Sequence, residues 1–445
     1  AWLRNYFGEE RHKPIVHPAV YSAVRKFVYG APIISRAAII TSGVGCQNTC
    51  RFCATTHKFE KQYTAFLSTG KEVFDACEKS EKELNTTEYA VMDENFCKSP
   101  KRARQLLEEM EKHNKAYTFS IFSSAETIGK LGVDFLVRLG IKFVWIGVES
   151  KANVFDKTKG IDLHALIADL QNHGISVLAS AILFMEHHDK ETMQEDIDWA
   201  ISLESDLLQF MEFGPIPGTR LYKEYEEEGK LLKNIPWHKQ HGQDEIWFKH
   251  PHFTLPETAE VTKQAFIKSF HVNGPGVLNM AHSYLKGYRT VKKEMENHKR
   301  LGLTWNPETL RYEASADPAP DRYMEIRLEE LRKSALEFRP IFPAAIKYAP
   351  NEKSADKARM VQNLFDETFG PMTIGERFYT AIVSACAIVE NFRYKMNGGV
   401  MRQPGTNRVT YPDRTGKRHT GEGHARRTHL REDHHIHRVK VGAGD

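Results

Sequence analysis

The residues best suited to chemistry are three cysteines that lie close together in the chain, at Cys46, Cys50 and Cys53. Thiolates are soft ligands, and three of them in one short segment suit a metal-sulfur centre. The segment follows the apolar run Ala37–Thr41, and Gly43 and Gly45 between the two let the backbone bend sharply. The C-x3-C-x2-C spacing therefore predicts a metal-binding loop directly after a buried strand.

The number of cysteines limits the kind of metal site. A structural zinc site is closed by four ligands, and a ferredoxin cluster also takes four cysteines. Three thiolates on a four-iron cluster leave one iron open to a substrate or cofactor. Two alternatives stay open: three unrelated buried thiols, or a zinc site completed by Cys97 or a histidine. We expect Cys77 and Cys386 to be small buried hydrophobes.

Length and composition describe an ordinary globular protein. The chain has 445 residues, 41% of them hydrophobic and 27% charged, which is enough for two or three domains. The net charge of +4 implies no particular partner. Six cysteines in so long a chain favour a reducing cytoplasm over a disulfide scaffold. We find no transmembrane segment and no signal peptide. Residue 1 is Ala, so we expect a fragment or a chain whose first residues were removed.

Short apolar runs alternate with amphipathic runs along the first half of the chain. The expected strands are Ala37–Thr41, Glu88–Met92, Tyr117–Ser123, Lys142–Val148, Ser176–Phe184 and Leu207–Phe213. The expected helices are Gly70–Leu84, Pro100–Asn114, Ala125–Leu139, Asp162–His173 and Lys190–Leu203. Six such alternations predict an α/β fold with parallel strands and crossover helices. Eight units would close a full barrel, so six predict a partial one.

The remaining sequence is expected to form further regions around this barrel of residues 36–235. Residues 1–35 are expected to be a linker with a short helix around Tyr21–Tyr29. Residues 236–300 are expected to cover the barrel with a histidine-rich and aromatic loop, 236–256, and helices. Residues 301–397 are predicted to be helical after a linker at 305–322, and residues 398–445 to be a disordered basic tail.

Polar residues follow several of the predicted strands. In parallel barrels, functional residues collect at the carboxyl ends of the strands. Besides the cysteine segment, the candidates at these ends are Asp93, Glu94, Ser123 and Glu149. A carboxylate at a buried strand end is costly without a donor, so Glu149 must meet a partner. The partner of Glu149 is then either a cofactor or a basic side chain from a loop.

Several motifs together resemble the radical S-adenosylmethionine (SAM) superfamily. They are the cysteine spacing with Phe52 before its last cysteine, the stretch Asp93–Phe96, the segment Gly147–Ser150 and the turn Gly214–Thr219. The last three look like the class that carries an N-terminal cobalamin-binding domain. The resemblance covers residues 36 to about 235 well. It implies a partial (β/α)6 TIM-like barrel with a helical C-terminal extension.

The resemblance also implies cofactors and their ligands. Cys46, Cys50 and Cys53 would hold a 4Fe-4S cluster whose open iron chelates SAM. Phe52, Asp93, Glu94, Ser123 and Glu149 would then lie around SAM. The family often has a Gly-Gly-Glu motif where this chain has Asp93 and Glu94, so these two correspond by position alone. Only 45 residues precede Cys46 and no Asp-x-His-x-x-Gly motif is visible, which leaves the use of cobalamin open.

The implied activity is reductive cleavage of SAM to a 5'-deoxyadenosyl radical. The resemblance favours transfer of a methyl or other carbon group to an unactivated carbon of a small or lipid-like substrate. The expected partner is an electron donor such as flavodoxin or ferredoxin, and nothing clearly indicates a nucleic acid. The alternatives are a cobalamin-independent enzyme for C–C coupling or rearrangement, and a non-enzymatic iron-sulfur or zinc protein.

Overall fold

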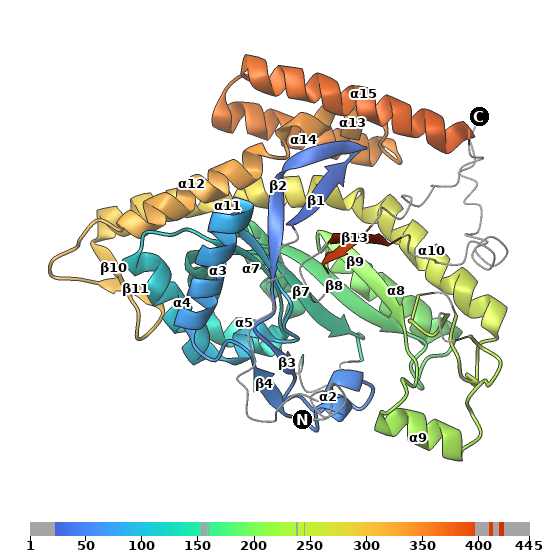
Figure 1. Cartoon of the computed structure of the whole chain (residues 1–445). Coiled ribbons are helices and arrows are strands. Elements are labelled where there is room, and N and C mark those ends of the chain that lie inside the picture. Colours follow the sequence, from blue (N-terminus) through green and yellow to red (C-terminus); the bar gives the residue numbers. More distant parts are fainter. Residues whose placement is uncertain are drawn as a thin grey trace.

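A seven-stranded sheet organises the first half of the chain (Figure 1). The computed structural model describes residues 23–152, 158, 160–236, 239–243, 245–396, 409–412 and 418–421. In spatial order the strands of this sheet are β1 (Ala23–Val28), β2 (Ala31–Ile40), β5 (Glu88–Val91), β6 (Thr118–Phe122), β7 (Ile141–Glu149), β8 (Ser176–Leu183) and β9 (Leu207–Glu212). Strands β2 and β5 to β9 pair in parallel, and β1 joins the edge antiparallel to β2.

The helices that connect the strands follow the expected pattern. They are α3 (Gly70–Leu84), α4 (Pro100–Lys112), α5 (Ala125–Leu131), α6 (Val133–Leu139), α7 (Leu163–Asn172) and α8 (Lys190–Ser202), with α9 (Arg220–Glu227) after the last strand. The prediction of a partial (β/α)6 barrel is confirmed. The single helix expected over Ala125–Leu139 is two helices, because Gly132 between them has a φ of 82°.

The core of the barrel lies between the sheet and these helices. Alternate residues of β7, such as Val144, Ile146 and Val148, are buried, as are Leu106 and Met110 of α4. A second buried cluster joins the helices after residue 275. None of the helices in the described part of the chain has both the length and the apolar character that crossing a bilayer requires.

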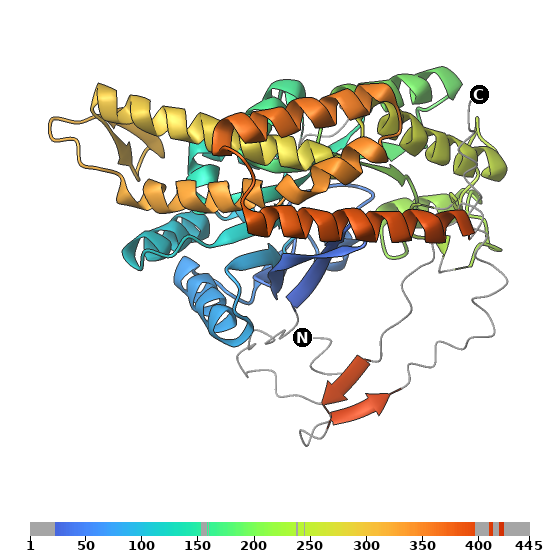
Figure 2. The same ribbon diagram turned by 90° about the horizontal axis from the view of Figure 1, so that it is seen from above.

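The C-terminal helices gather on one side of the sheet (Figures 1 and 2). They are α10 (Leu255–Asn273), α11 (Gly276–Leu301), α12 (Arg322–Leu336), α13 (Phe342–Lys347), α14 (Glu352–Phe369) and α15 (Ile374–Met396). Arg327 of α12 donates to the carbonyl oxygen of Tyr117 (2.6 Å), which directly precedes β6. Lys142 at the start of β7 pairs with Glu337 (3.4 Å) beyond α12. Helix α12 and the residue after it therefore lie at the amino ends of the strands, whereas α10 reaches the carboxyl end of β9, where Thr262 Oγ1 donates to Glu212 Oε1 (2.9 Å).

Two further expectations are corrected. The helix expected around Tyr21–Tyr29 is strand β1, because Tyr29 and Gly30 both have positive φ (50° and 78°) and form a two-residue hairpin turn into β2. The linker expected at 305–322 contains part of a hairpin of β10 (Leu303–Asn306) and β11 (Arg311–Ala314). The Asn306 side chain accepts from the Glu308 amide (2.9 Å) and so shapes its turn.

The termini lie largely outside the described residues. Of the expected linker, residues 1–22 lie outside them. Of the expected disordered tail, the described residues are the paired strands β12 (Val409–Pro412) and β13 (Arg418–Gly421). The disorder of the rest of the tail stays a prediction.

Close approach of two glycines fixes the packing of α11 on the barrel. A Cβ on Gly287 would lie 2.2 Å from the Cα of Gly174, so Gly287→Ala must push α11 away from the start of β8. We expect a loss of about 1–3 kcal/mol in the free energy of unfolding, measured by urea denaturation followed by circular dichroism. Gly129→Ala is the control, since its Cβ meets nothing within 4 Å. Equal stability of the two variants would contradict this packing.

Candidate active site

The cysteine loop lies at the carboxyl end of the first parallel strand. It is bracketed by the two-stranded pairing of β3 (Gly43–Gly45) with β4 (Tyr63–Ala65), and its last cysteine begins helix α2 (Ala54–Lys58). The amide of Cys53 donates to the carbonyl oxygen of Cys50 (3.2 Å), which closes a turn between them. All three cysteines of the motif are partly buried. The loop therefore presents three thiols from one tightly folded segment.

The two glycines before the loop are required by its geometry. A Cβ on Gly43 would lie 2.3 Å from the hydroxyl oxygen of Tyr63, and Gly45 has a φ of 100°. A Cβ on Gly45 would also lie 2.2 Å from the carbonyl oxygen of Gln62. The predicted bend is present, and any larger residue would separate β3 from β4.

The donor set fits a cluster of iron and sulfide. Burial raises the pKa of the Cys46 thiol, and the neighbouring Cys53 and Glu94 raise that pKa further. A thiolate whose charge is disfavoured in this way is stabilised by a bound cationic centre. Cys97, one candidate for a fourth zinc ligand, is fully buried, and burial raises its pKa to about 12. Its surroundings favour a neutral thiol.

The two acidic residues after β5 lie in different surroundings. Asp93 is buried, and its Oδ2 accepts from Ser42 Oγ (2.7 Å), Tyr63 Oη (2.6 Å) and Arg102 Nη2 (2.9 Å). Its Oδ1 accepts from the amide of Asn95 (3.0 Å). Four protein donors thus engage the Asp93 carboxylate, which ties the β3–β4 hairpin to the end of β5 and to α4.

Glu94 lies beside the cysteine loop instead. Burial raises the pKa of its carboxyl, and Asp93 raises it further. Hydrogen bonds from Gly45 in β3 and from Thr55 in α2 act in the opposite direction on that pKa. Glu94 thus contacts Gly45 and Thr55, which lie close before and after the three cysteines in the chain.

The ends of β5 and β6 share a row of buried polar side chains. Ser123 Oγ donates to Asn95 Oδ1 (2.8 Å), and Asn95 Nδ2 donates to Ser124 Oγ (3.2 Å). Ser124 Oγ also lies 2.8 Å from Thr127 Oγ1 at the start of α5. The predicted site residue Ser123 is therefore held in place by Asn95, a residue for which the sequence suggested no separate role.

Glu149 ends β7 in a strained conformation. It is buried, and its φ of 62° lies in the left-handed region, which costs a non-glycine residue about 1–3 kcal/mol. The pairing of β7 with β8 shifts register between Gly147 and Glu149. Phe184 at the end of the neighbouring β8 also has a positive φ (60°). Such strain at adjacent strand ends is typical of functional sites.

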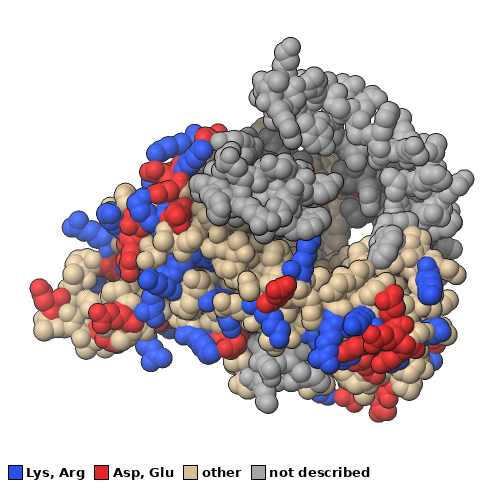
Figure 3. All heavy atoms as spheres, turned by 60° about the horizontal axis from the view of Figure 1, so that its bottom comes forward, with Lys and Arg blue, Asp and Glu red and all other residues tan. Residues whose placement is uncertain are grey.

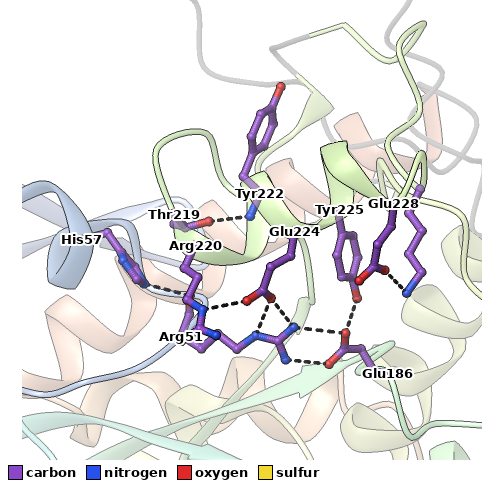
Figure 4. A network of polar contacts seen from close by, with 10 residues as sticks. Arg51, His57, Glu186, Thr219, Arg220, Tyr222, Glu224, Tyr225 and Glu228 are labelled. Atoms are coloured by element: carbon purple, nitrogen blue, oxygen red, sulfur yellow. Dashed lines mark hydrogen bonds and ion pairs between the residues drawn. The ribbon is translucent and has the colours of Figure 1, made fainter.

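A network of exposed charges joins the cysteine loop to the far edge of the sheet (Figure 4). Arg51 lies within the cysteine motif, and its Nη2 donates to Glu224 of α9 (2.6 Å) while its Nη1 donates to Glu186 after β8 (3.0 Å). Tyr225 Oη donates to the same Glu186 (2.9 Å). The Phe52 ring meets Phe213 edge-on at 6.2 Å between centroids. Sequence reasoning missed this bridge, since Arg51 and Glu224 lie 173 residues apart in the chain.

The loop expected at 236–256 packs against the ends of β8 and β9. Trp247 is buried and donates from Nε1 to the carbonyl oxygen of Pro215 (2.7 Å). A Cβ on Gly214 would lie 2.2 Å from the Trp247 ring, so glycine is required in this turn. His250 is also buried, with Nε2 3.1 Å from the Met185 carbonyl oxygen. These aromatic and histidine side chains support the strand ends.

One further group of side chains near these ends is close enough to hold an ion, namely His187, His188 and Asp196. His188 accepts at Nδ1 from the amide of Met185 (3.0 Å) and bonds Asp196 through Nε2 (2.9 Å). Both ring nitrogens are thus used within the protein. The arrangement is a buried hydrogen-bond pair.

Figure 3 turns forward the lower side of Figure 1, where α2, β3, β4 and α9 lie. Over the described part of this face, basic and acidic side chains lie side by side. A long polyanion is bound by a surface on which positive charge predominates. This distribution gives no argument for a nucleic-acid partner on this face.

Comparison with curated proteins finds a distant relative. The chain is 25% identical over 245 residues to the protein named uncharacterized methyltransferase PH0819, from Pyrococcus horikoshii. The match covers 54% of this chain and 52% of the relative, so the chain spans about half the length of the curated relative that it matches. No protein-family model matches the sequence.

Solved structures of similar architecture include two of the radical SAM methyltransferase TsrM from Kitasatospora setae. The TsrM structure with tryptophan substrate and a SAM analogue has a TM-score of 0.43 and 15% identity, over 59% of this chain and 62% of that one. The structure with cobalamin and a 4Fe-4S cluster scores 0.39 at 16% identity, over 67% and 60%. Methylornithine synthase PylB scores 0.32 at 15% identity, over 56% and 68%. These TM-scores are low, so the fold is defined here by the order and direction of the strands in this chain.

The bridge of Arg51 to Glu186 and Glu224 predicts a measurable effect on the loop. Arg51→Gln should speed hydrogen exchange at the amides of Cys53 and His57, because the loop loses its contact with α9. The free energy of unfolding should change by less than about 1 kcal/mol, since the ion pairs are exposed.

Arg220→Gln is the matched control for this variant. Arg220 also bonds Glu224 (2.7 Å), but it belongs to α9 and not to the cysteine loop. Hydrogen-exchange mass spectrometry of the three proteins distinguishes the two roles. Unchanged exchange of the loop in Arg51→Gln would show that the bridge does not restrain it.

Proposed function

We propose that this chain is a radical SAM enzyme in which Cys46, Cys50 and Cys53 hold a 4Fe-4S cluster. The observation that carries the proposal is the placement of three partly buried thiols on one loop, at the carboxyl end of the first of six parallel strands. The other described cysteines are elsewhere: Cys77 and Cys97 are fully buried, and Cys386 lies on α15. The set of three supports a cluster with one open iron over a closed zinc site.

The side chains of this chain would hold and orient the cofactors. When bound, the cluster and SAM supply a strong reductant and the source of a 5'-deoxyadenosyl radical. Glu94, beside the cysteine loop, and Ser123 and Glu149, at the ends of β6 and β7, lie on the same edge of the sheet. We assign Glu94 and Glu149 to the cationic and hydroxyl groups of SAM, because carboxylates accept hydrogen bonds from both. Asp93 would stabilise the cysteine loop through its hydrogen bonds with Ser42 and Tyr63, and Phe52 would do so through its contact with Phe213.

We further propose that the reaction is a transfer of a carbon group. A relative over half of the chain is named a methyltransferase, which supports transfer of a methyl or other carbon group. The substrate would be small or lipid-like, with an electron donor such as flavodoxin or ferredoxin as partner in the cytoplasm. Cobalamin would carry the transferred group, as in the class that the strand-end motifs resemble.

Removing any one cysteine of the motif tests the cluster. Cys46→Ala, Cys50→Ala and Cys53→Ala should each lose bound iron after anaerobic reconstitution and should release no 5'-deoxyadenosine from SAM. Cys386→Ala is the control, and it should retain both properties since that residue lies on α15. Iron content and product are measured by absorbance and liquid chromatography. Cleavage of SAM that persists in the three variants would refute the assignment.

The role of Glu149 is tested separately from that of the cluster. Glu149→Gln keeps the shape of the side chain but removes its charge, so SAM should bind about 10- to 100-fold more weakly with iron content unchanged. Equilibrium dialysis of SAM gives the affinity. Glu126→Gln, on α5 beyond the end of β6, is the control and should bind SAM normally. An unchanged affinity in Glu149→Gln would remove this residue from the site.

A further inference from the structure

A second candidate site lies at the amino ends of the strands, whereas the cysteine loop lies at their carboxyl ends. A cavity of about 270 Å3 opens between the amino end of β9 and the helices α10, α11 and α14. Its basic lining residues are His282 and Lys286 of α11 and Lys353 and Lys357 of α14. Four basic side chains from two helices therefore line one cavity. Neither the cysteine loop nor the carboxyl ends of the strands contribute to its lining.

The ammonium groups in this cavity meet mainly neutral partners. Lys357 Nζ donates to Asn279 Oδ1 (2.7 Å), and Lys353 Nζ donates to the carbonyl oxygen of Val272 (3.3 Å). Lys286 Nζ forms no hydrogen bond and no ion pair with any other residue that the structure describes. Lys286 and Lys357 are partly buried, and Lys353 is exposed. An anionic partner stabilises a partly buried ammonium, and the hydrogen-bond acceptors of Lys357 and Lys353 are neutral, so the cavity favours an added anion.

The acidic residues of the cavity do not supply this counter-charge in full. Asp206 is buried, and its two oxygens accept from Ser283 Oγ (2.7 Å) and from the amide of Val177 (2.8 Å). Glu204 is exposed, and it raises the pKa of Lys286 and of Lys357 only from a distance. Burial nevertheless outweighs both acids and lowers the pKa of each of these two lysines.

The positive charges of the lysines also lower the pKa of the histidine in the cavity, His282. Burial lowers the pKa of His282 to about 4, and the charges of Lys286 and Lys357 contribute to this shift. The groups facing His282 are Lys286 on its own helix, Lys353 and Lys357 on α14, and Glu204 and Asp206 on the barrel. Net positive charge therefore prevails at the ring.

The amino end of α14 adds to the positive potential. This helix has 18 residues and begins at Glu352, and Lys353 and Ser354 in its first turn line the cavity. The Asn351 side chain caps the Ser354 amide (2.9 Å), so the contribution of this helix end is its dipole. The amino end of a helix favours anions and disfavours a lysine. A lysine at this position conflicts with the local electrostatics, and such conflicts are typical of binding sites.

We propose that this cavity binds a small molecule through a phosphate-type oxyanion held by Lys286, Lys353 and Lys357. A doubly charged oxyanion accepts hydrogen bonds from several ammonium groups at once and neutralises them together. A cavity of about 270 Å3 has room for such a group and a short organic remainder. The site is separate from the cysteine loop and does not depend on the function proposed for it.

Sulfate is a suitable probe because it stays doubly negative across the neutral range. Isothermal titration calorimetry of the full chain with sulfate should show one site. Lys286→Gln and Lys357→Gln should each weaken binding about tenfold or more, since each loses a charge-assisted contact. Lys293→Gln is the control: it changes an exposed lysine of the same helix α11 and should leave the affinity unchanged.

The pH dependence gives a second readout that does not rely on lysine variants. A bound oxyanion raises the pKa of His282, so sulfate binding takes up a proton and should tighten as the pH falls from 7.5 to 5.5. This tightening should be lost in His282→Gln. Absence of sulfate binding by the unaltered chain, or equal affinity in the lysine variants and the control, would overturn the proposal.

Discussion

The buried ion pair of Asp93 with Arg102 is the interaction on which the cysteine loop depends. Both side chains are almost inaccessible to solvent, at 1% and 2% exposure. The same carboxylate accepts from Ser42, which directly precedes β3, and from Tyr63, the first residue of β4, and the pairing of these two strands holds the loop. Breaking a buried pair by removing one partner typically costs about 3–5 kcal/mol, because the other charge is left uncompensated. The end of β5, α4 and the loop are thereby fixed relative to one another.

The loop is held very differently on its other side. Arg51 and Glu186 are 47% and 44% exposed, and pairs of this kind contribute about 0–1 kcal/mol each. The Phe52 contact with Phe213 adds an apolar link to the end of β9. Movement that widens the mouth would break only these weaker contacts and would leave the Asp93 pair intact.

Sequence alone predicted the barrel well for a physical reason. Parallel strands are buried on both faces, so they appear as short apolar runs, and α3 has the residues that cap it, Thr69 and Glu72, at its start. The six strands were therefore predicted to within a few residues, apart from the start of β2. The hairpin of β1 and β2 was missed because its turn is formed by Tyr29 with Gly30, and tyrosine is an unusual residue at positive φ.

The candidate site could be predicted only in part. The cysteines and the strand ends follow from spacing and topology, which act locally. The partners of Asp93 and Arg51 come from distant segments, and composition or periodicity carries no information about such pairs. For the same reason the sequence could not show that Arg327 and Glu337 attach α12 and the residue after it to the amino ends of the strands.

The most direct test of the account is electron paramagnetic resonance of the anaerobically reconstituted, reduced protein with and without SAM. If three cysteines hold the cluster, one iron is left for SAM, and the 4Fe-4S signal should change when SAM is added. A signal indifferent to SAM, or zinc in place of iron, would contradict the account and would indicate a closed structural metal site.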